Sequence, residues 1–410
     1  MHPTIERCAG LDVHQATVMA TVRVPDGAGG RQEITETFGT MTAALVTLRD
    51  WLQAHGVTHV AMESTGVYWK PVYYVLEEAF MLLLVNVQQL QQVPGRKSDV
   101  RDSAWIAQLL EWGLLRGSLV LPPAMRDLRD LTRYRKHQIR DRAREINRLH
   151  RVLEDAGLKL STVATDVMGV SGRAMLEALL HGTTDPGVLA DLATGKLRKK
   201  LPALREALAG HFRSHHRFLI GQILAKVDFL DDTIVTLTEE IDRLIAPFEA
   251  KLTALDTIPG VDRKAAVTIV AETGGDMSRF PTAGHLCSWA GMCPGQNESA
   301  GKRRSGKTRK ANRYLRGALI EGGLAATRAN ATALQARYYR VKRNRGHKKA
   351  VVATGHHILE IAFYILRDGV SYQELGGDYF DRKHRDRAIR RHVRQLEELG
   401  YKVTLDEVAA

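Results

Sequence analysis

The chain has 410 residues, 44% of them hydrophobic, which exceeds the length at which one core keeps growing, so we expect two or more domains. Its formal net charge of +13 favours a polyanionic partner. Three scattered cysteines (Cys8, Cys287, Cys293) exclude a disulfide framework, and the longest apolar run, from Phe80, is too short to span a bilayer. These features favour a cytoplasmic protein with a reducing environment.

Residues 1–120 have the pattern of an α/β domain. Residues 9–24 and 31–38 have strand-like composition, and a helix is predicted at 42–55. Strands and helices then alternate, with a strand at 58–65, a helix at 68–80, a strand at 82–87 and a helix at 100–112. The predicted order β-β-β-α-β-α-β-α belongs to mixed-sheet α/β domains, and it is the order of the ribonuclease H-like fold.

The middle of the chain predicts two long helices. Residues 122–156 are helical and basic, with ten Lys/Arg against four acids between Met125 and Arg151. From Ile220 to Phe248, apolar residues recur at steps of three and four, as in a coiled coil. This seam favours self-association slightly over packing inside one subunit.

The last third combines helices with a cationic segment. A Pro-Gly turn at 259–260 between helical stretches is typical of helix-hairpin-helix elements, and also of ordinary helix pairs. Asn297 begins NESAGKRRSGKTRK, in which Ser299 precedes six cations in nine residues. Residues 300–349 hold sixteen Lys/Arg and one acid, Glu321, so this window carries 16 − 1 = +15, more than the net charge of the whole chain. The tail from Asp381 predicts another basic helix.

Four acids occupy places that suit a metal site. Asp12 lies within an apolar strand, where a carboxylate is costly to bury without a cation or a hydrogen bond. Glu63 ends another strand, and Asp99 and Asp102 are three residues apart, so a helix would place them on one face. Oxygen ligands without a His/Cys set favour Mg²⁺, or Mn²⁺, over zinc. Each acid also has an ordinary structural role open to it, such as a helix cap for Asp99.

Five motifs, in order, resemble the DEDD transposases of the insertion-sequence 110 family, the bridge-RNA-guided recombinases. They are GLDVH, AMESTGVYW, GRKSDVRDSAWIAQLL, IPGV and WAGMCPGQNESAGKRRSGKTRKANRYLR, and they extend from Asp12 to about Ala326. The segment beyond about Tyr338 matches less distinctly. Ser103 stands where the family often has alanine, a change that we expect to be tolerated.

The resemblance implies a RuvC-like fold, a set of metal-binding catalytic acids and a serine nucleophile. The metal set is Asp12, Glu63, Asp99 and Asp102, and Ser299 is the residue that becomes linked to DNA, while Ser305 is the rival nucleophile. It further implies donor and target DNA, a noncoding guide RNA, and a homo-oligomer, dimer or tetramer, in which one subunit's nuclease-like domain meets another's serine domain. Metal ions and flanking cations would activate a hydroxyl that is a poor nucleophile alone.

Basic residues in two places are predicted to contact nucleic-acid phosphates rather than bases. Near the serine these are Lys302, Arg303, Arg304, Lys307, Arg309, Lys310, Arg313 and Arg316; on the long basic helix they are Arg133, Arg140 and Arg144. For that helix a solvated face is an equally simple interpretation.

We therefore expect four regions: a RuvC-like catalytic domain at 1–120, a helical coiled-coil domain at 121–252, a helical serine domain with a helix-hairpin-helix-like element at 253–345, and a basic helical extension at 346–410. The expected function is an Mg²⁺-dependent DNA transposase that cuts and rejoins phosphodiesters. The alternatives are a metal-dependent junction nuclease that activates water, and a non-enzymatic nucleic-acid-binding scaffold. A sugar kinase of the same fold superfamily is disfavoured because glycine-rich phosphate loops are absent near Asp12.

Overall fold

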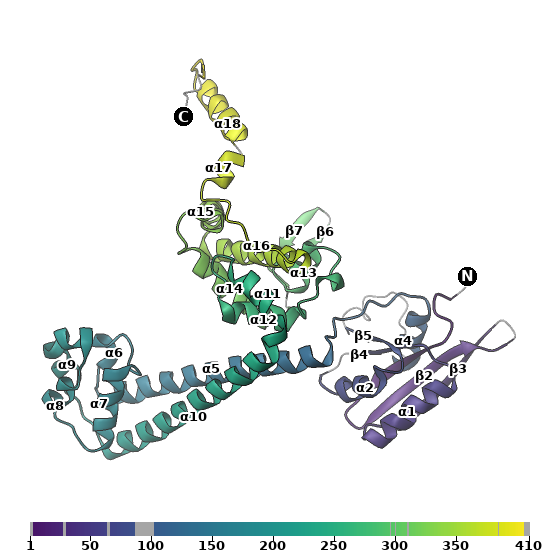
Figure 1. The fold of residues 1–410 in the computed structure, drawn as a ribbon, viewed down its shortest axis with the longest axis horizontal. Coiled ribbons are helices and arrows are strands. Elements are labelled where there is room, and N and C mark those ends of the chain that lie inside the picture. Colours follow the sequence, from purple (N-terminus) through teal and green to yellow (C-terminus); the bar gives the residue numbers. More distant parts are fainter. Residues whose placement is uncertain are drawn as a thin grey trace. The chain divides into compact units, whose positions relative to one another are not determined.

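The computed structural model describes residues 3–27, 30–63, 66–86, 102–295, 297–299, 301–309, 311–383 and 385–405. It contains two compact units, Met1–Val120 and Leu121–Ala410, which are coloured along the chain in Figure 1. The first predicted domain boundary falls at the same residue, and the finer division of 121–410 stays a prediction. Among the described helices, none has the length and apolarity needed to cross a bilayer.

A five-stranded mixed sheet forms the first unit, in the order β3-β2-β1-β4-β5. β1 (Cys8–Val13), β2 (Thr17–Pro25) and β3 (Arg31–Gly39) form an antiparallel meander. β4 (His59–Glu63) runs parallel to β1, and β5 (Met81–Val85) runs parallel to β4. The predicted mixed sheet is confirmed.

Helices cover both faces of this sheet (Figure 1). α1 (Thr42–Ala54) and α2 (Trp69–Leu76) bury leucines and a valine against one face, together with Leu11 of β1. α4 (Asp102–Glu111) packs on the other face against Cys8 of β1 and against residues of β4 and β5. Alternate residues of β1, β4 and β5 therefore serve two separate cores, as a period of two requires.

Two long helices dominate the start of the second unit. α5 (Pro123–Asp155) and α10 (Ser214–Ile245) pack along each other, and Ile220 and Val227 of the predicted seam are buried. The heptad pattern thus reflects, at these buried positions, packing of α10 on α5 within one chain, and self-association through the rest of the seam stays a prediction.

A small helical layer is inserted between the two long helices. Its elements are α6 (Leu160–Val163), α7 (Val170–Leu180), α8 (Pro186–Asp191), the 3-10 helix η1 (Gly195–Lys200) and α9 (Leu201–Ala207). They share one core with Leu149 of α5 and Ile220 of α10. The insert begins and ends at one place, because the Lys159 amide donates to Ala207 and the His211 amide donates to Ala156.

The remainder is helical apart from one hairpin. Its elements are η2 (Ala246–Phe248), α11 (Glu249–Asp256), α12 (Arg263–Thr273), η3 (Met277–Arg279), α13 (Ala283–Trp289), β6 (Asn297–Ser299), β7 (Lys302–Ser305), α14 (Arg313–Ala326), α15 (Ala333–Arg345), α16 (His347–Asp368), α17 (Tyr379–Lys383) and α18 (Arg385–Glu398). α16 packs against α11, α13, α14 and α15. The predicted domain boundary at 345 therefore separates two helices, α15 and α16, that contact each other.

Close packing explains two glycines of this region. A Cβ on Gly355 of α16 would lie 2.5 Å from the backbone oxygen of Leu319, so α14 and α16 touch backbone to backbone. Gly260, in the predicted Pro-Gly turn, has φ +89° and lies against α14, where a Cβ would be 2.3 Å from the Gly322 oxygen. The turn is confirmed, while its proposed phosphate contact stays a prediction.

Candidate active site

The sheet places three of the predicted acids at one end of one face. In the register of β1 and β4, Leu11 pairs with Met62, so one further step puts Asp12 beside Glu63. Asp12 lies two residues after Gly10, and Glu63 lies two residues after Ala61; Gly10 and Ala61 pair with each other. Side chains two apart on a strand share a face, so both acids lie on the face that packs against α4.

α4 brings the third acid to the same end. A Cβ on Gly10 would lie 2.2 Å from the Ser103 backbone oxygen and 2.4 Å from the Ala107 nitrogen, so the first turns of α4 rest directly on β1. The Cys8 thiol lies 3.5 Å from the Ala107 oxygen, so α4 runs antiparallel to β1 and begins near the end that carries Asp12. Asp102, the first residue of α4, therefore lies at that end.

Ser103 contributes to this placement. Its side chain is fully buried, and its hydroxyl lies 2.8 Å from the Thr21 hydroxyl, which in turn lies 3.0 Å from that of Thr35. The first turn of α4 is thus hydrogen-bonded to β2, and through Thr21 to Thr35 of β3.

The donor set fits a hard divalent cation in kind. Asp12 is one-fifth exposed and lies 3.2 Å from the His14 imidazole. Within the described residues, the ligand atoms of Asp12, Glu63 and Asp102 do not all lie within 4.8 Å of one another. Asp99, the fourth predicted acid, lies outside the described residues. Carboxylates brought to one strand end can hold Mg²⁺ or Mn²⁺ through oxygen atoms and water.

The predicted nucleophile lies near the tip of a β-hairpin. β6 and β7 pair with Ser299 opposite Lys302, and Gly301 in the turn has φ +74° with open space around it. At the base, the Gly295 amide donates to Lys307 over 2.8 Å, and a Cβ on Gly295 would collide with that same oxygen at 2.7 Å. Gly295 therefore serves the pairing of the two strands, whereas Gly301 is left free at the tip.

The rival serine occupies a different part of the hairpin. Ser305 pairs with Asn297 at the base, and its hydroxyl accepts a hydrogen bond from the Lys307 amide at 3.2 Å. Its hydroxyl is thus engaged in the chain's own turn. The sequence pattern predicted a cationic loop and not a hairpin here. Strands of three and four residues without alternating apolar residues give no recognisable strand pattern.

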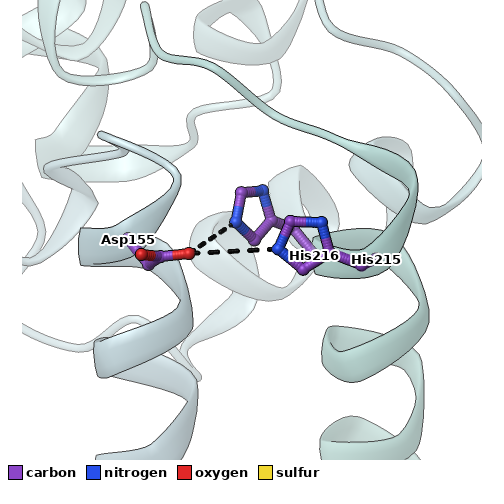
Figure 2. Close-up of side chains that lie close together, drawn as sticks. All are labelled: Asp155, His215 and His216. Atoms are coloured by element: carbon purple, nitrogen blue, oxygen red, sulfur yellow. Dashed lines mark hydrogen bonds and ion pairs between the residues drawn. The ribbon is translucent and has the colours of Figure 1, made fainter.

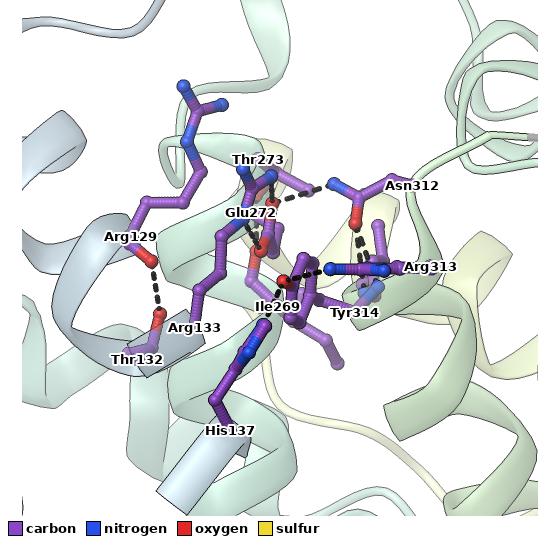
Figure 3. Close-up of polar contacts among 11 residues, drawn as sticks. Arg129, Thr132, Arg133, His137, Ile269, Glu272, Thr273, Asn312, Arg313 and Tyr314 are labelled. Carbon is purple, nitrogen blue, oxygen red and sulfur yellow. Dashed lines mark hydrogen bonds and ion pairs between the residues drawn. The ribbon is translucent and has the colours of Figure 1, made fainter. Parts of the chain in front are cut away.

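A buried carboxylate fixes the far end of this segment (Figure 3). Glu272 of α12 is 1% exposed, and the Arg133 guanidinium donates to both of its oxygens at 2.8 and 2.7 Å. The Asn312 amide donates to the same carboxylate at 2.7 Å, while the Asn312 oxygen caps α14 by accepting from the amides of Tyr314 and Leu315. Glu272 thereby joins α5 to the residue at which the hairpin segment enters α14.

The sequence reasoning missed this cluster. Glu272 lies in an otherwise apolar stretch, AAVTIVAET, which is the same signal that pointed to Asp12. Burial opposes the charge of Arg133, but its hydrogen bonds to Glu272 and its attraction to that carboxylate and to nearby Tyr314 and Asp130 together outweigh burial and raise the pKa of Arg133. Arg133 also stacks on Tyr314 at 4.8 Å. The structure thus gives Arg133 contacts within the protein.

The other predicted phosphate-contacting residues differ in their surroundings. Lys302, Lys307 and Arg309 are exposed along the hairpin and its base. Arg313 is exposed and stacks on Tyr314 at 4.9 Å, and Arg316 is half-buried in α14. Arg140 and Arg144 are exposed on α5, where Arg144 pairs with Asp141 at 2.6 Å. The side chains of Arg303, Arg304 and Lys310 lie outside the described part of the chain.

Cysteine and histidine side chains lie just before the hairpin. The Cys293 sulfur is 3.6 Å from the Nε2 atom of His356, whose Nδ1 atom is 3.5 Å from Glu360. Hydrogen bonds from His356 and His357 hold the pKa of Glu360 well below its ordinary value. Burial raises the pKa of the Cys293 thiol above its ordinary value.

One His/Asp group in the described residues brings its ligand atoms within 4.8 Å of one another: Asp155, His215 and His216 (Figure 2). His216 Nδ1 accepts the Arg213 backbone N–H at 3.1 Å, so its Nε2 carries the proton that it donates to Asp155 at 2.8 Å. A metal at Nε2 would instead require a proton on Nδ1, facing another N–H. The group is therefore built as a hydrogen-bonded latch between the end of α5 and the start of α10.

We expect this latch to weaken in acid. The hydrogen bond from His216 is the main cause of the lowered pKa of Asp155. Because the pKa is depressed in the folded state, the ionised carboxylate contributes stability above about pH 4, and this is lost as the pH falls through the folded pKa. Asp155→Asn should flatten the dependence of unfolding on pH below about pH 4. Urea titrations at several pH values measure it.

Asp191→Asn is the matched control, because Asp191 is 63% exposed and has only a 3.3 Å ion pair with Arg205. This variant should keep the wild-type pH profile. Equal profiles for Asp155→Asn and the wild type would contradict the latch.

Comparison with known proteins gives matches in both units. A DEDD transposase model of the IS110 type, described as "Transposase", matches residues 9–157, and a model described as "Transposase IS116/IS110/IS902 family" matches residues 252–339. The first segment contains Asp12, Glu63 and Asp102 at the end of the sheet. It also contains Asp99, which lies outside the described residues. The second contains the serine hairpin and Glu272.

Three curated relatives belong to insertion elements. The chain is 34% identical over 164 residues to an uncharacterized 43.6 kDa protein of element IS110 from Streptomyces coelicolor, a match that covers 37% of this chain and 39% of that protein, less than half of its length. It is 29% identical over 327 residues to an uncharacterized 42 kDa protein of IS900 from Mycobacterium paratuberculosis, covering 71% of this chain and 80% of that protein.

The third relative is an uncharacterized 44.8 kDa protein of element IS116 from Streptomyces clavuligerus, 27% identical over 320 residues, with 70% of this chain and 78% of that protein covered. The two family models match in chain order, and the IS900 and IS116 proteins are matched over most of their length. These matches fit a chain whose first unit carries acids at one end of its sheet. The chain belongs to the IS110 family of transposases.

Proposed function

We propose that this transposase cuts and rejoins DNA by two successive transesterifications. Asp12, Glu63 and Asp102, with Asp99, would hold divalent metal ions, Mg²⁺ or Mn²⁺, and Ser299 would be the nucleophile. The observation that carries the proposal is the meeting of β1, β4 and α4, which brings three acids to one end of one sheet face.

The metal ions, when bound, supply charge neutralisation at the attacked phosphate and at the leaving oxygen. The Ser299 oxygen attacks phosphorus, an O–P bond to the serine forms, and the bond from phosphorus to one DNA oxygen breaks; the serine proton leaves to a base and the departing oxygen takes up a proton. A hydroxyl of a second DNA strand then reverses these steps and frees the serine. The phosphodiester energy is kept in the serine ester, so rejoining needs no ATP.

Two features of the hairpin support Ser299 as the nucleophile. Ser299 lies next to the turn, where a Cβ on Gly301 would meet no atom of the described residues outside its chain neighbours within 4 Å, so the turn leaves room for a DNA backbone to approach. Exposed cations such as Lys302 and Lys307 follow it and would neutralise phosphates. Ser305 is less suited because its hydroxyl is already bonded at the hairpin base.

A noncoding guide RNA and a homo-oligomer complete the proposal. RNA pairing would select donor and target DNA, leaving the protein to contact backbones. Oligomerisation would let the acids of one subunit meet the hairpin of another. RNA that copurifies with the protein, when sequenced, should match the flanks of the insertion element; copurified RNA of random sequence would argue against guidance.

Covalent trapping on element-end DNA tests the chemistry. With Mg²⁺ and DNA, denaturing gels should show a protein–DNA adduct that maps to Ser299 and is absent in Ser299→Ala. Asp12→Asn should lower the rate by at least about a thousandfold, as expected for loss of a metal ligand in phosphoryl transfer, while DNA binding persists. Ser305→Ala is the matched control in the same hairpin and should keep the adduct.

Other results would assign other functions. Cleavage without an adduct would indicate a junction nuclease that activates water. An adduct that persists in Ser299→Ala and disappears in Ser305→Ala would move the nucleophile. DNA binding with neither cleavage nor an adduct, and unchanged in Asp12→Asn, would leave a non-enzymatic nucleic-acid-binding scaffold, with the acids in structural roles.

A further inference from the structure

A cationic groove lies between α15 and α17, at the edge of the second matched segment and mostly beyond it. Its cavity has a volume of about 380 Å³, and its lining residues are Arg337, Arg340, Val341, Asn344, Arg345 and Phe380. All but the last come from α15 at helical spacings that share one side of the helix. The Arg340 guanidinium lies 5.7 Å over the ring of Phe380, which α17 contributes.

Within the described residues, no acid neutralises the positive charge of the groove. Between Glu321 and Glu360 the sequence has no acid and eight Lys/Arg. Among the described residues, no carboxylate pairs with any of the three groove arginines. The Nε atom of Arg337 is buried in the floor without a hydrogen-bond partner in the described part of the chain.

In another cavity of the second unit, cations are paired with carboxylates of the chain. A pocket of about 500 Å³ between α5, α12 and α14 also contains cations. There, Arg133 is bound to Glu272, and Lys136 lies 2.9 Å from Glu321. Arg133 and Lys136 of that pocket thus already have carboxylate partners, whereas within the described residues the three arginines of the α15 groove have none.

We propose that the α15–α17 groove binds a single-stranded stretch of nucleic acid, with phosphates on Arg340 and Arg345 and a base stacked against Phe380. Guanidinium groups donate in a planar fork that matches phosphate oxygens. Unpaired bases stack on aromatic rings and on guanidinium planes, and both surfaces are present here. The volume is near the lower end of pockets that enclose a ligand of nucleotide size, about 300 Å³ and above.

This site is separate from the proposed chemistry. It uses none of the sheet-end acids and no residue of the β6–β7 hairpin. Binding here would hold a strand whether that strand is the DNA substrate or an RNA. Its test therefore measures binding, so failure of the groove and failure of the serine mechanism give different results.

The test uses the full chain and fluorescent 20-nucleotide oligo-dT, oligo-U and a duplex of equal length. Arg340→Glu combined with Arg345→Glu should weaken binding of the single strands by at least about tenfold, and should reduce the slope of log affinity against log salt by about 1.4, since each single-strand phosphate contact contributes about 0.7. Phe380→Ala should weaken binding at least about fivefold with the slope unchanged, because stacking carries no charge.

The matched control is Arg198→Glu combined with Lys199→Glu, which makes the same charge change at two exposed cations of η1. It should leave single-strand affinity within about twofold of wild type. If the glutamate pair unfolds α15, Arg340→Gln with Arg345→Gln should still lower affinity. Comparing the affinities for oligo-dT and oligo-U shows whether the groove prefers DNA or RNA. A preference for either one supports the proposal that the groove binds a single strand.

Photocrosslinking locates the contact on the wild-type protein. Oligonucleotides that carry 4-thiouracil or 4-thiothymine should crosslink to peptides that contain residues 338–345 or 379–383. Crosslinks confined to other peptides would overturn the proposal, as would an equal loss of affinity in the control pair or tighter binding of the duplex than of both single strands.

Discussion

Glu272→Ala should lower the free energy of unfolding of residues 121–410 by about 3 kcal/mol, because it leaves a partly buried arginine without its carboxylate. Arg133 loses both hydrogen bonds to Glu272, and Asn312 loses a third. For a unit of this size, such a loss corresponds to a fall in Tm of roughly 6–12 °C. Calorimetry on the full chain, following the transition of the second unit, measures it.

Glu321→Ala is the control, since Glu321 is 66% exposed and holds Lys136 at 2.9 Å on the surface. Exposed pairs contribute about 0–1 kcal/mol, so its Tm should stay near that of wild type. If both variants melted alike, Glu272 would not be what joins α5, α12 and the start of α14. A further consequence for Glu272→Ala is a looser cap on α14, visible as faster amide exchange at Tyr314 and Leu315.

Gly10→Ala should destabilise residues 1–120 by at least about 3 kcal/mol, at the upper end of the usual cost of overpacking. The added methyl carbon would lie 2.2 Å from one backbone atom of α4 and 2.4 Å from another, and backbone cannot rotate away as a side chain can. α4 must therefore lift from β1, which moves Asp102 away from Asp12. Urea unfolding and limited proteolysis of the first unit report the change.

Gly317→Ala provides the comparison for this substitution. Gly317 lies in α14 with nothing within 4 Å of an added Cβ. Alanine there should be neutral or stabilise by roughly 0.5–1 kcal/mol, because glycine is the weaker helix former. A Gly10→Ala protein as stable as wild type would contradict the direct packing of α4 on β1.

Local patterns predicted the elements with strong periodicity. The basic helix expected at 122–156 is α5 at Pro123–Asp155, and the helix expected at 42–55 is α1 at Thr42–Ala54. The helix expected at 68–80 ends earlier, at Leu76, because the chain turns there to enter β5. In each case the apolar spacing was sufficient because nearby residues decide the conformation.

Features that depend on distant contacts were not predictable in the same way. The acids Asp12, Glu63 and Asp102 were named from the sequence, but what brings Asp102 to the end of β1 that carries Asp12 is the close approach of α4 at Gly10, which no local pattern reveals. Glu272 and Asn312 are 40 residues apart, and only the fold shows that the Glu272 carboxylate of α12 accepts a hydrogen bond from the residue that caps α14. Ser103, which stands where the family often has alanine, places its hydroxyl against Thr21 of a strand far away in the chain, a partner that no local pattern reveals.

The insert between α5 and α10 leaves and rejoins the long helices at a single point, closed by the Asp155–His216 contact. A segment attached in this way acts as a cassette. Lengthening, shortening or exchanging residues 159–211 would leave the spacing of the two helices intact, provided that the replacement has closely spaced ends. The family could therefore acquire new surfaces at this tip without rebuilding the parts of the chain that carry the acids and the serine.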